Sequence, residues 1–328
     1  MKLLVLSAAE VQRLLPMAEC IEVMAQALGD LARGRVEQPL RMILKPQQAL
    51  GLMAFMPSYR AGNPGAFGVK VVGVFHGNVS RGKDSHQGAV LLFDGESGEP
   101  LAVMNASAVT AIRTAAVSGL ATKLLANADA SDLAILGAGV QARSHLLAVA
   151  CVRKLSRVRV ASRSPEGARR FAAEMAKESP VPIESMASAE QAVRGADLIV
   201  TATSAAEPIL RREWIAAGAH LNVVGASLPT SREVDGATIG AAAVFVDRRE
   251  SAENEAGDYL LAVKEGAAAA GCIRAELGEV VIGAKPGRTS AKEITLFKSL
   301  GLAIEDLAAA QHVYARAQAE ASGTRVEF

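Results

Sequence analysis

The chain has 328 residues, which is enough for two domains, because single hydrophobic cores stop growing beyond about 250–300 residues. Its 35 basic and 34 acidic residues give a formal net charge of +1, which excludes the broad positive field that gathers nucleic acid or anionic membrane. Apolar residues make up 50% of the chain and aromatic residues 4%, a composition typical of a packed α/β protein. We therefore expect no nucleic-acid or membrane partner, and an anionic ligand must be bound by local groups.

The three cysteines, Cys20, Cys151 and Cys272, are far apart and have no histidine at ligand spacing. Neither a disulfide framework nor a metal site is indicated, so we interpret all three as buried or inert thiols. The first apolar run is interrupted by Ser7 and Glu10 and is too short for a signal peptide. We also expect no run of about 20 apolar residues that could span a membrane, and the sequence predicts a cytoplasmic protein.

The first third of the chain predicts helices followed by strands. S-A-A-E at 7–10 precedes apolar residues at helical spacing and predicts a capped helix, continued by a second helix over 21–31. Between 35 and 101, short apolar runs broken by glycine, proline and asparagine predict strands, with DGESGEP as a hairpin turn. A long helix over 107–126, rich in small residues, should link the two domains.

From residue 132 the chain alternates between predicted strands and helices. The strands are LAILG, RVRVA, DLIVTAT, HLNVVGAS and AVFVD, and helices are predicted over 140–149 and 165–177. This alternation is typical of a parallel, doubly wound sheet. We expect the C-terminal segment 297–321 to form one long amphipathic helix. The predicted fold class is α/β, with a Rossmann doubly wound parallel sheet and a second α+β domain.

A glycine-rich turn after the strand LAIL predicts a dinucleotide site. Gly137-Ala138-Gly139-Val140-Gln141-Ala142 matches the G-x-G-x-x-G/A pattern between a strand and a helix. In this pattern the first glycine allows the tight turn, the second lets the backbone approach the pyrophosphate, and the small sixth residue lets the helix pack closely. The positive helix N-terminus would bind the anionic pyrophosphate.

The end of the second strand of the doubly wound sheet predicts the choice of cofactor. An acid about 20 residues after the glycines binds the ribose 2′-hydroxyl of NAD, whereas arginine accepts the 2′-phosphate of NADP. Here RVRVA is followed by Ser162-Arg163-Ser164, without an acid. The sequence therefore favours NADP(H) over NAD, and Ser164 before Pro165 also predicts a helix N-cap.

Three isolated cations upstream of the glycine turn predict a site for an anionic substrate. Arg41, Lys70 and Arg113 stand in the apolar or small-residue stretches PLRMIL, FGVKVVG and TAIRTAA. Because burial of an unpaired cation is costly, we expect them to converge on a carboxylate or to line a cleft. His86, in KDSHQG, is a candidate proton donor near neutral pH. The acids that follow Asp247 are interpreted as a solvated helix face, and no metal site is predicted.

Together these segments resemble the ornithine cyclodeaminase/mu-crystallin family over nearly the whole chain. The residues that carry the resemblance are FGVKVV, SHQGAVLLFD, PLAVMNASAVTAIRTAAVSGLATK, LAILGAGVQARSH, NVVGAS, LGEVVIG and LFKSLGLAIEDL. The resemblance implies a homodimer whose substrate-binding and dimerisation domain comprises residues 1–118 and 302–328. It implies that residues 119–301 form an inserted NADP-binding Rossmann domain.

The resemblance also implies roles for matching residues. Arg41, Lys70 and Arg113 match the cluster that binds the substrate carboxylate, with Lys70 close to the reacting carbon. The positions that touch the dinucleotide in the family correspond here to Thr114, Gly137, Gly139, Gln141, Thr203, Val224 and Ser299. On the substrate side we add Met53 and Ser227.

Two departures from the cyclodeaminase pattern change the predicted activity. Cyclodeaminases carry an acid where this chain has Ala54, shortly before Met56-Pro57, and an aspartate where it has Ser227. Without these carboxylates, the distal amine of ornithine and the proton transfer of cyclisation lose their partners. These differences, with Ser85-His86-Gln87 and Arg163, resemble the mu-crystallin branch and imply reduction of cyclic ketimines with NADPH.

We therefore predict an NAD(P)H-dependent reductase of a cyclic imino acid, pyrroline-2-carboxylate or piperideine-2-carboxylate, which yields proline or pipecolate. The proton can come from the substrate itself, from Lys70, from His86 or from an ordered water. The alternatives are an NAD(P)-dependent alanine dehydrogenase, an ornithine cyclodeaminase and a non-catalytic NADPH-binding protein. NAD stays open as the second choice of cofactor.

Overall fold

The chain divides into two units, each built around its own sheet: Met1–Thr114 with Gly301–Phe328, and Ala115–Leu300. This computed structural model describes residues 2–328, apart from the side chains of His76, Val79 and Ser80. Helix α3 (Ala106–Leu125) continues from the first unit into the second, and the boundary predicted after residue 118 falls within it.

The first unit contains a mixed, mostly antiparallel sheet in the order β16-β1-β7-β6-β5-β4-β2, with β3 paired to β4. Its strands are β1 (Lys2–Leu6), β2 (Val36–Glu37), β3 (Met42–Leu44), β4 (Leu52–Arg60), β5 (Ala66–Val74), β6 (His86–Asp94), β7 (Pro100–Asn105) and β16 (Thr324–Glu327). Besides the start of α3, its helices are α1 (Ala8–Leu14), α2 (Met17–Ala32), the 3-10 helix η1 (His76–Arg81) and α11 (Ala303–Ala319).

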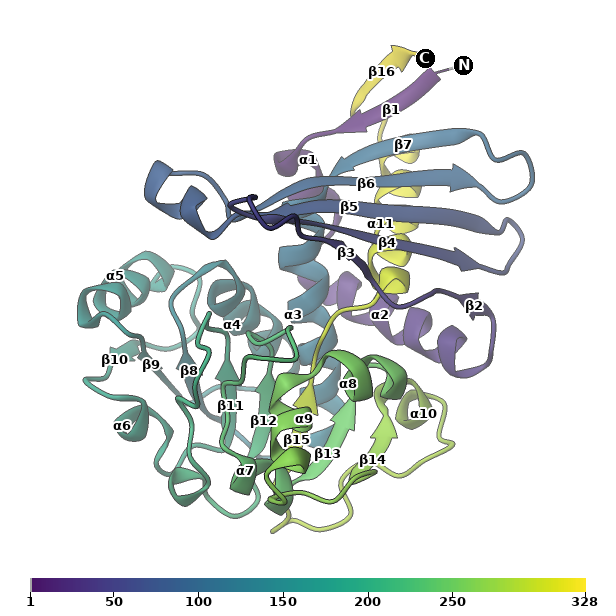
Figure 1. Ribbon diagram of the computed structural model, residues 1–328. Coiled ribbons are helices and arrows are strands. Elements are labelled where there is room, and N and C mark those ends of the chain that lie inside the picture. The colour runs from purple at the N-terminus through teal and green to yellow at the C-terminus, as the bar shows by residue number, and fades with distance from the viewer. Residues whose placement is uncertain (1) are drawn as a thin grey trace. The chain divides into compact units, whose positions relative to one another are not determined.

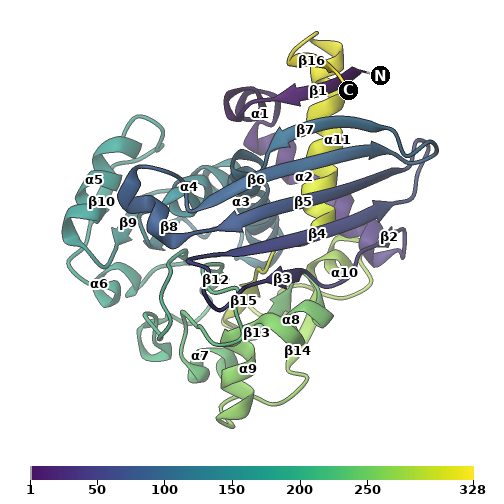
Figure 2. The same cartoon turned by 45° about the horizontal axis from the view of Figure 1, so that its top comes forward.

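Helix α11 lies along one face of this sheet and packs on β4, β5 and β6 (Figures 1 and 2). Side chains alternate between the two faces of a strand. In β5 the buried residues Ala66, Lys70 and Val72 share the face of Gly68, where a Cβ would lie 2.9 Å from Leu307 of α11. Lys70 therefore points toward α11 and into the core of the first unit.

The second unit contains an entirely parallel sheet in the order β10-β9-β8-β11-β12-β15-β13-β14. Its strands are β8 (Asp132–Leu136), β9 (Arg157–Ala161), β10 (Ile183–Ser185), β11 (Leu198–Thr201), β12 (His220–Val223), β13 (Ala243–Val246), β14 (Ile273–Glu276) and β15 (Thr295–Lys298). Its helices are the rest of α3, α4 (Val140–Val152), α5 (Pro165–Met175), α6 (Ala189–Val193), η2 (Arg212–Trp214), α7 (Gly236–Ala241), α8 (Arg249–Glu255), α9 (Gly257–Lys264) and α10 (Leu277–Val281).

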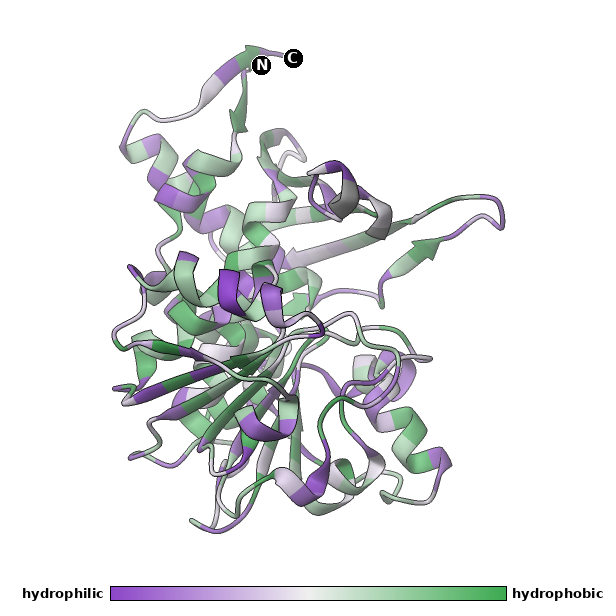
Figure 3. Ribbon diagram, turned by 90° about the vertical axis from the view of Figure 1, so that its left-hand side faces the viewer, coloured by the Kyte–Doolittle hydropathy of each residue, from purple (hydrophilic) through white to green (hydrophobic). Residues whose placement is uncertain are grey.

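This strand order confirms the predicted Rossmann fold. The chain runs outward from β8 through β9 to β10 and then returns to β11 on the other side of β8, so the order reverses beside β8. In such sheets ligands bind outside the carboxyl ends of the strands at this reversal. The central strands are buried along their length and mostly apolar, because helices cover both faces of the sheet (Figure 3).

Two local predictions of the first unit are confirmed. Ser7 caps α1 in a reciprocal capping box with Glu10, and β6 and β7 form an antiparallel hairpin around the predicted turn. Strands β1 and β16 were not predicted. The cysteines were interpreted as buried or inert thiols: Cys20 is buried, Cys272 partly buried and Cys151 exposed. Burial of part of the Cys151 side chain raises the pKa of its thiol.

The prediction for the C-terminal segment was wrong over its first residues. Phe297 and Lys298 belong to β15, which is inserted between β12 and β13, and α11 begins only at Ala303. Gly301, with φ of +80°, separates strand from helix. The first half of α11 is buried on all sides rather than amphipathic, since Glu305 and Asp306 are buried together with the apolar residues around them.

Helix α3 is long and apolar enough to span a membrane by composition alone, which corrects the expectation that no such stretch is present. However, 72% of its apolar window is buried inside the protein, as in the central helix of a folded core. Two of its residues, Arg113 and Lys123, are charged.

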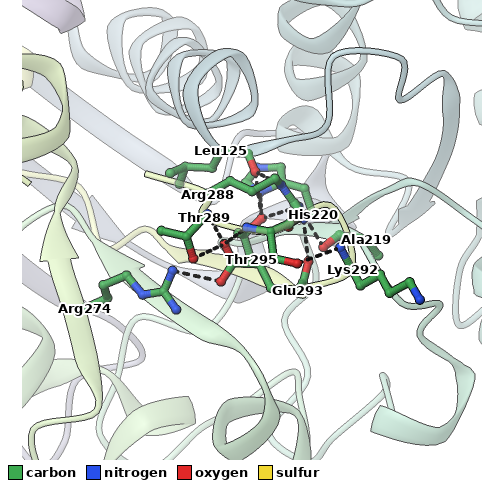
Figure 4. A network of polar contacts seen from close by, with 10 residues as sticks. Leu125, Ala219, His220, Arg274, Arg288, Thr289, Lys292, Glu293 and Thr295 are labelled. Carbon is green, nitrogen blue, oxygen red and sulfur yellow. Dashed lines mark hydrogen bonds and ion pairs between the residues drawn. The ribbon is translucent and has the colours of Figure 1, made fainter. Parts of the chain in front are cut away.

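A polar network ties the amino ends of β12 and β15 to the end of α3 (Figure 4). The Arg288 guanidinium donates to the carbonyls of Leu125 and Ala219, at 2.7 and 3.4 Å, and to Thr295 Oγ1 at 2.9 Å. The buried His220 contacts Thr295 Oγ1 through Nδ1 at 3.0 Å. This network lies at the edge of the sheet opposite the carboxyl ends, so we assign it a structural role.

Candidate active site

Arg41 and Lys70 come from adjacent strands and share one face of the first sheet. Arg41 directly precedes β3, in which Met42 pairs with Phe55, so continuation of this register places Arg41 opposite Met56. Met56 pairs in turn with Lys70 on β5. Because cross-strand neighbours project from the same face, Arg41, Met56 and Lys70 form a row on the face that α11 covers.

Arg113 joins this row from α3, and the cations meet two acids of α11. Lys70 Nζ lies 2.7 Å from Asp306 Oδ2, and Arg113 Nε donates to Asp306 Oδ1 at 3.0 Å. Arg113 Nη1 donates to Glu305 Oε2 at 2.5 Å. Sequence reasoning expected the cations to converge on a carboxylate but did not single out these two acids, because their segment was predicted only as a long amphipathic helix.

Burial and neighbouring charges change the protonation of this cluster. Burial, assisted by the positive charges of Arg113 and Arg41, lowers the pKa of Lys70 to about 8, although Asp306 acts in the opposite direction. Burial also acts to lower the pKa of Arg113, but Asp306 and Glu305 outweigh it and raise that pKa. Lys70 can therefore exchange a proton near neutral pH, whereas Arg113 stays charged.

The backbone of Gly301 lies close to the side chains of both Arg41 and Arg113. Its carbonyl accepts a hydrogen bond from Arg41 Nη2 at 3.3 Å, and a Cβ at this position would lie 2.4 Å from Arg113 Nη1. The φ of +80° also favours glycine. Gly301 is thus a residue of the cluster that the sequence pattern did not single out.

Two predicted substrate-side residues are not brought to this cluster. His86 is exposed at the start of β6 and pairs with Val74, about 13 Å along β5 from Lys70 at the usual rise per residue. Met53 lies an odd number of residues from Met56 along β4, so it projects from the opposite face of the sheet.

Ala54 does lie on the face of Lys70. It pairs with Val72, two residues along β5 from Lys70, so its methyl group points to the same side of the sheet as the row. This is the position where cyclodeaminases are expected to carry an acid. The cluster therefore lacks a carboxylate there.

The predicted glycine turn follows β8, beside the reversal of strand order. Gly137 has φ of +123° and lies so close to the next loop that a Cβ would be 2.4 Å from the Ala202 carbonyl. Gly139 is the N-cap of α4, and a Cβ there would meet nothing within 4 Å. Val140 is exposed and Gln141 follows it in the first turn, while Ala142 is buried.

This turn fits a pyrophosphate. The first turn of α4 contains no acidic residue, and no side chain caps its N-terminus, so its backbone N–H groups can bind an anion. The open space at Gly139 lets a ligand approach the backbone. Together, the strand order and the turn define a dinucleotide-binding domain.

The turn after β9 is organised by serines, and Arg163 projects from it. Ser162 Oγ donates to the Ser164 carbonyl at 2.5 Å, and Ser164 Oγ accepts from Gly167 N at 3.2 Å, which confirms the predicted N-cap of α5. Arg163 is exposed. An exposed arginine at the end of the second Rossmann strand is available for a phosphate on the ribose.

The remaining predicted cofactor residues of the second unit follow the central strands. Thr203 lies after β11, Val224 directly after β12 and Ser299 directly after β15. Ser299 is buried, and its Oγ has no hydrogen-bond partner within residues 115–300 as described. Ser227 lies in the same loop after β12 as Val224 and is partly buried. Thr114, the predicted cofactor residue of the first unit, is buried on α3 next to Arg113.

A buried carboxylate that the sequence analysis missed fixes these loops. Glu233 accepts hydrogen bonds from Thr203 N and Oγ1, both at 2.7 Å, from Gly225 N at 2.6 Å and from Thr201 Oγ1 at 2.8 Å. Burial raises the pKa of Glu233, and the charge of Lys298 and the hydroxyl of Thr203 oppose this rise. The loops after β11 and β12 are therefore tied to one side chain.

Lys298 and Asp258 extend this arrangement to β15. Lys298 Nζ lies 2.9 Å from Asp258 Oδ2 and donates to the Ala226 carbonyl at 2.5 Å. Asp258 Oδ1 accepts from the backbone N–H groups of Glu233 and Val234. Asp258 is buried, contrary to its interpretation as part of a solvated helix face after Asp247. Lys298 stands at the start of the segment predicted as one amphipathic helix, so the missed strand β15 concealed this ion pair.

Comparison with known proteins identifies the family. The family model described as "Ornithine cyclodeaminase/mu-crystallin family" matches residues 1–321, and the chain belongs to this family. It is 42% identical over 313 residues to ketimine reductase mu-crystallin of Mus musculus, covering 94% of this chain and 96% of that protein. It is 39% identical over 327 residues to Delta(1)-pyrroline-2-carboxylate reductase of Bacillus cereus, covering 99% of this chain and 100% of that protein.

A solved structure matches both units. Thermococcus litoralis Delta(1)-pyrroline-2-carboxylate reductase, in complex with NADH and L-proline, has a TM-score of 0.96 and 40% sequence identity, covering 99% of this chain and 100% of that one. The predicted family and fold class are thereby confirmed. Within residues 2–328 as described, no group of three or more His, Cys, Asp or Glu side chains is arranged to hold a metal ion.

Proposed function

We propose that this protein is an NAD(P)H-dependent reductase that converts a cyclic imino acid, pyrroline-2-carboxylate or piperideine-2-carboxylate, into proline or pipecolate. The observation that carries the proposal is the convergence of Arg41, Lys70 and Arg113 in one unit of a chain whose other unit has a dinucleotide-binding fold. The names of the relatives support it, since they are reductases of ketimines and of pyrroline-2-carboxylate. L-proline, bound by the Thermococcus protein, is the expected product of one of these substrates.

In this proposal the two arginines bind the substrate and the lysine transfers a proton. Arg41 and Arg113 bind the substrate carboxylate through charge-assisted hydrogen bonds, which orients the planar imine. Lys70, with its pKa lowered to about 8, donates a proton to the imine nitrogen and makes the adjacent carbon electrophilic. When bound, the reduced nicotinamide dinucleotide supplies the hydride.

Lys70 is the proton donor that the geometry supports. It is buried among the cations that would bind the carboxylate, whereas His86 is exposed at the far end of the neighbouring strand. His86 stays a prediction of the sequence as a catalytic residue. Met53 and Ser227 likewise stay predictions for the substrate side.

We propose that NADP(H) is preferred over NAD(H). Arg163 supports this preference, because it is exposed at the end of β9, where an acid would be expected in an NAD-specific site. Gly137, Gly139, Val140 and Gln141 would hold the pyrophosphate. The other residues proposed to contact the cofactor are Ser162, Ser164, Thr203, Val224, Ser299 and Thr114.

We also propose a cytoplasmic homodimer in which the first unit provides substrate binding and dimerisation. Exposed apolar side chains on that unit support a protein interface: Met42, Ile43 and Leu44 of β3, Leu50 at 88% exposure, and Phe67. All three cysteines are free thiols, in accord with a reducing compartment. Light scattering of the purified protein during gel filtration measures its oligomeric state.

The test is NADPH oxidation at 340 nm with pyrroline-2-carboxylate and piperideine-2-carboxylate, with NADH in parallel. Faster turnover of a cyclic imine than of pyruvate with ammonia supports the proposal. Turnover of pyruvate with ammonia alone would make the protein an alanine dehydrogenase, and release of ammonia from ornithine would make it a cyclodeaminase. NADPH binding without turnover of any of these would support a non-catalytic binding protein.

A further inference from the structure

Helix α11 begins with two buried acids that face the cations of the site. Glu305 and Asp306 are 0% and 1% exposed and stand in the first turn of the helix. A helix N-terminus favours carboxylates, but burial of two adjacent negative charges is costly without paired cations. Gln38 Oε1 accepts from Ile304 N at 2.8 Å and so caps the same turn. The turn is therefore fixed at both its side chains and its backbone.

Asp306 bridges the two cations with different oxygens. Oδ2 lies 2.7 Å from Lys70 Nζ, and Oδ1 accepts from Arg113 Nε at 3.0 Å. Glu305 pairs with Arg113 at Nη1, at 2.5 Å. The acids thus bind Nε and Nη1 of the Arg113 guanidinium, and its Nη2 takes part in neither of these two ion pairs.

The charges of these four side chains balance. Lys70 and Arg113 carry two positive charges, and Glu305 and Asp306 carry two negative charges. Arg41, in the same row, adds one positive charge, which matches one substrate carboxylate. Glu305 and Asp306 reduce the positive charge that faces the substrate carboxylate. Attraction of the substrate therefore does not explain their position.

We propose that Asp306 is a positioning residue for proton transfer: its carboxylate holds the Lys70 ammonium charged and oriented, while Glu305 orients Arg113 for the substrate carboxylate. This inference rests on the proposed reductase function. Lys70 Nζ–H donates its proton to the imine nitrogen, the imine carbon accepts a hydride, and N–H and C–H bonds replace the C=N π bond. The neutral Lys70 amine then takes a proton from water.

The surroundings of Lys70 make Asp306 the group that favours its charged form. Arg113 on α3 and Arg41 before β3 both oppose the charge of Lys70, as does burial. The cross-strand neighbours Met56 and Val90 do not titrate. On α2, burial raises the pKa of Cys20, so its thiol stays neutral.

The experiment compares Asp306→Asn with Glu305→Gln by the pH dependence of kcat/KM for the cyclic imine. In the wild type, activity should fall as the pH rises through the Lys70 pKa of about 8. Loss of the Asp306 charge lowers that pKa. The alkaline limb of the kcat/KM profile, where activity decreases, should therefore shift to lower pH by about 1 pH unit or more. Glu305→Gln should raise the KM for the imine and move the limb much less.

Asp306→Glu provides the rescue, because it keeps the charge and should return the limb toward its wild-type position. An unmoved limb in Asp306→Asn, or an equal shift in Glu305→Gln, would overturn the proposal. Unchanged NADPH affinity in each variant shows that the dinucleotide-binding unit is folded.

A second readout separates this inference from the proposed function. The Lys70 Nζ chemical shift, followed over pH in [15N]lysine-labelled protein and assigned by its loss in Lys70→Arg, reports the protonation of Lys70 without turnover. A lower titration midpoint in Asp306→Asn supports the pairing even if the wild type reduces no cyclic imine. An identical midpoint in an active enzyme contradicts the role of Asp306 alone.

If Asp306→Asn does not fold, Asp306→Glu is compared with the wild type by the same titration. An unchanged alkaline limb and an unchanged midpoint support the proposal, and a lowered midpoint contradicts it.

Discussion

Lys70 Nζ and Asp306 Oδ2 lie 2.7 Å apart, and both side chains are almost completely buried. The two residues are far apart in sequence, on β5 and α11, so only the fold brings them together. A buried ion pair of this kind contributes little net stability, because desolvation offsets the attraction. The pair would instead keep Lys70 charged in a buried site, as the proposed role of Asp306 requires.

Replacement of Lys70 by methionine should remove catalysis and leave cofactor binding intact. Methionine fills a similar volume but cannot donate a proton, and proton transfer by a positioned side chain contributes about 10²–10⁴-fold to the rate. We expect kcat to fall within that range, measured by NADPH oxidation, with an unchanged dissociation constant for NADPH. Lys45→Met, at an exposed position just after β3, is the matched control and should keep wild-type activity. Normal turnover by Lys70→Met would remove its assignment as the donor.

Gly301→Ala should impair substrate binding through Arg113. The added Cβ would lie 2.4 Å from Arg113 Nη1, so the guanidinium or the turn must shift. We expect the KM for the imine to rise about tenfold, with a smaller change in the KM for NADPH. Gly266→Ala is the control, because Gly266 also has a positive φ, of +72°, but its Cβ would meet nothing within 4 Å. If both variants behave alike, backbone strain rather than Arg113 accounts for the effect.

The local signals were sufficient to predict the Rossmann unit. Gly137 and Gly139 stand between an apolar strand and a helix, and the strand–helix alternation that follows predicts a parallel, doubly wound sheet, which the sheet order confirms. The predicted caps at Ser7 and Ser164 depend on neighbouring residues alone and are also confirmed.

Long-range pairing was outside the reach of the sequence pattern. Strand β15 is only Thr295–Lys298, and its apolar residues continue into the helical pattern of α11, so a single helix was predicted. Strand β1 pairs with β7 and β16, from distant parts of the chain. Likewise, Arg41, Lys70 and Arg113 each suggested burial near an anion, but Glu305 and Asp306 were recognised as that anion only from the fold.

Gly139→Ala and Gly137→Ala should separate cofactor binding from folding. At Gly139 the methyl group has open space around it, so the fold tolerates it, but it would obstruct a pyrophosphate bound at this turn as proposed. We expect the dissociation constant for NADPH to rise about tenfold or more with little change in Tm. Gly137→Ala should lower the Tm, because its φ is +123° and the Cβ would lie 2.4 Å from the Ala202 carbonyl. Unchanged NADPH affinity in Gly139→Ala would place the pyrophosphate elsewhere.

His145 should make the second unit sensitive to acid. Its Nδ1 contacts the Gln141 carbonyl at 2.7 Å and its Nε2 contacts Ser118 Oγ at 2.9 Å; burial lowers its pKa to about 4, against about 6.5 in an unfolded chain. The unfolded state therefore binds more protons between these values, and the free energy of unfolding decreases as the pH falls through this window. At pH 5 the contribution is roughly 2 kcal/mol.

His145→Gln should reduce this loss of stability. Urea unfolding of the wild type and the variant at pH 7.5 and pH 5 measures it, and His220, whose pKa is lowered to about 3, remains in both proteins. The wild type should lose about 2 kcal/mol more than the variant on acidification. Equal losses in the two proteins would show that His145 is not the group responsible.

Arg163→Ala should change the choice of cofactor rather than the chemistry. The exposed guanidinium can contact a 2′-phosphate, which NADPH has and NADH lacks. The hydrogen bonds from Ser162 Oγ to the Ser164 carbonyl and from Gly167 N to Ser164 Oγ do not involve its side chain. We expect the KM for NADPH to rise about tenfold and the KM for NADH to stay the same, with kcat unaffected for both.

Arg169→Ala, which removes an exposed arginine that pairs with Glu166 on α5, controls for the general loss of positive charge. The salt dependence of the NADPH KM provides a further check, because a contact between exposed charges weakens with ionic strength. Parallel changes for NADPH and NADH in Arg163→Ala would contradict recognition of the 2′-phosphate and would favour NADH as an equally good reductant.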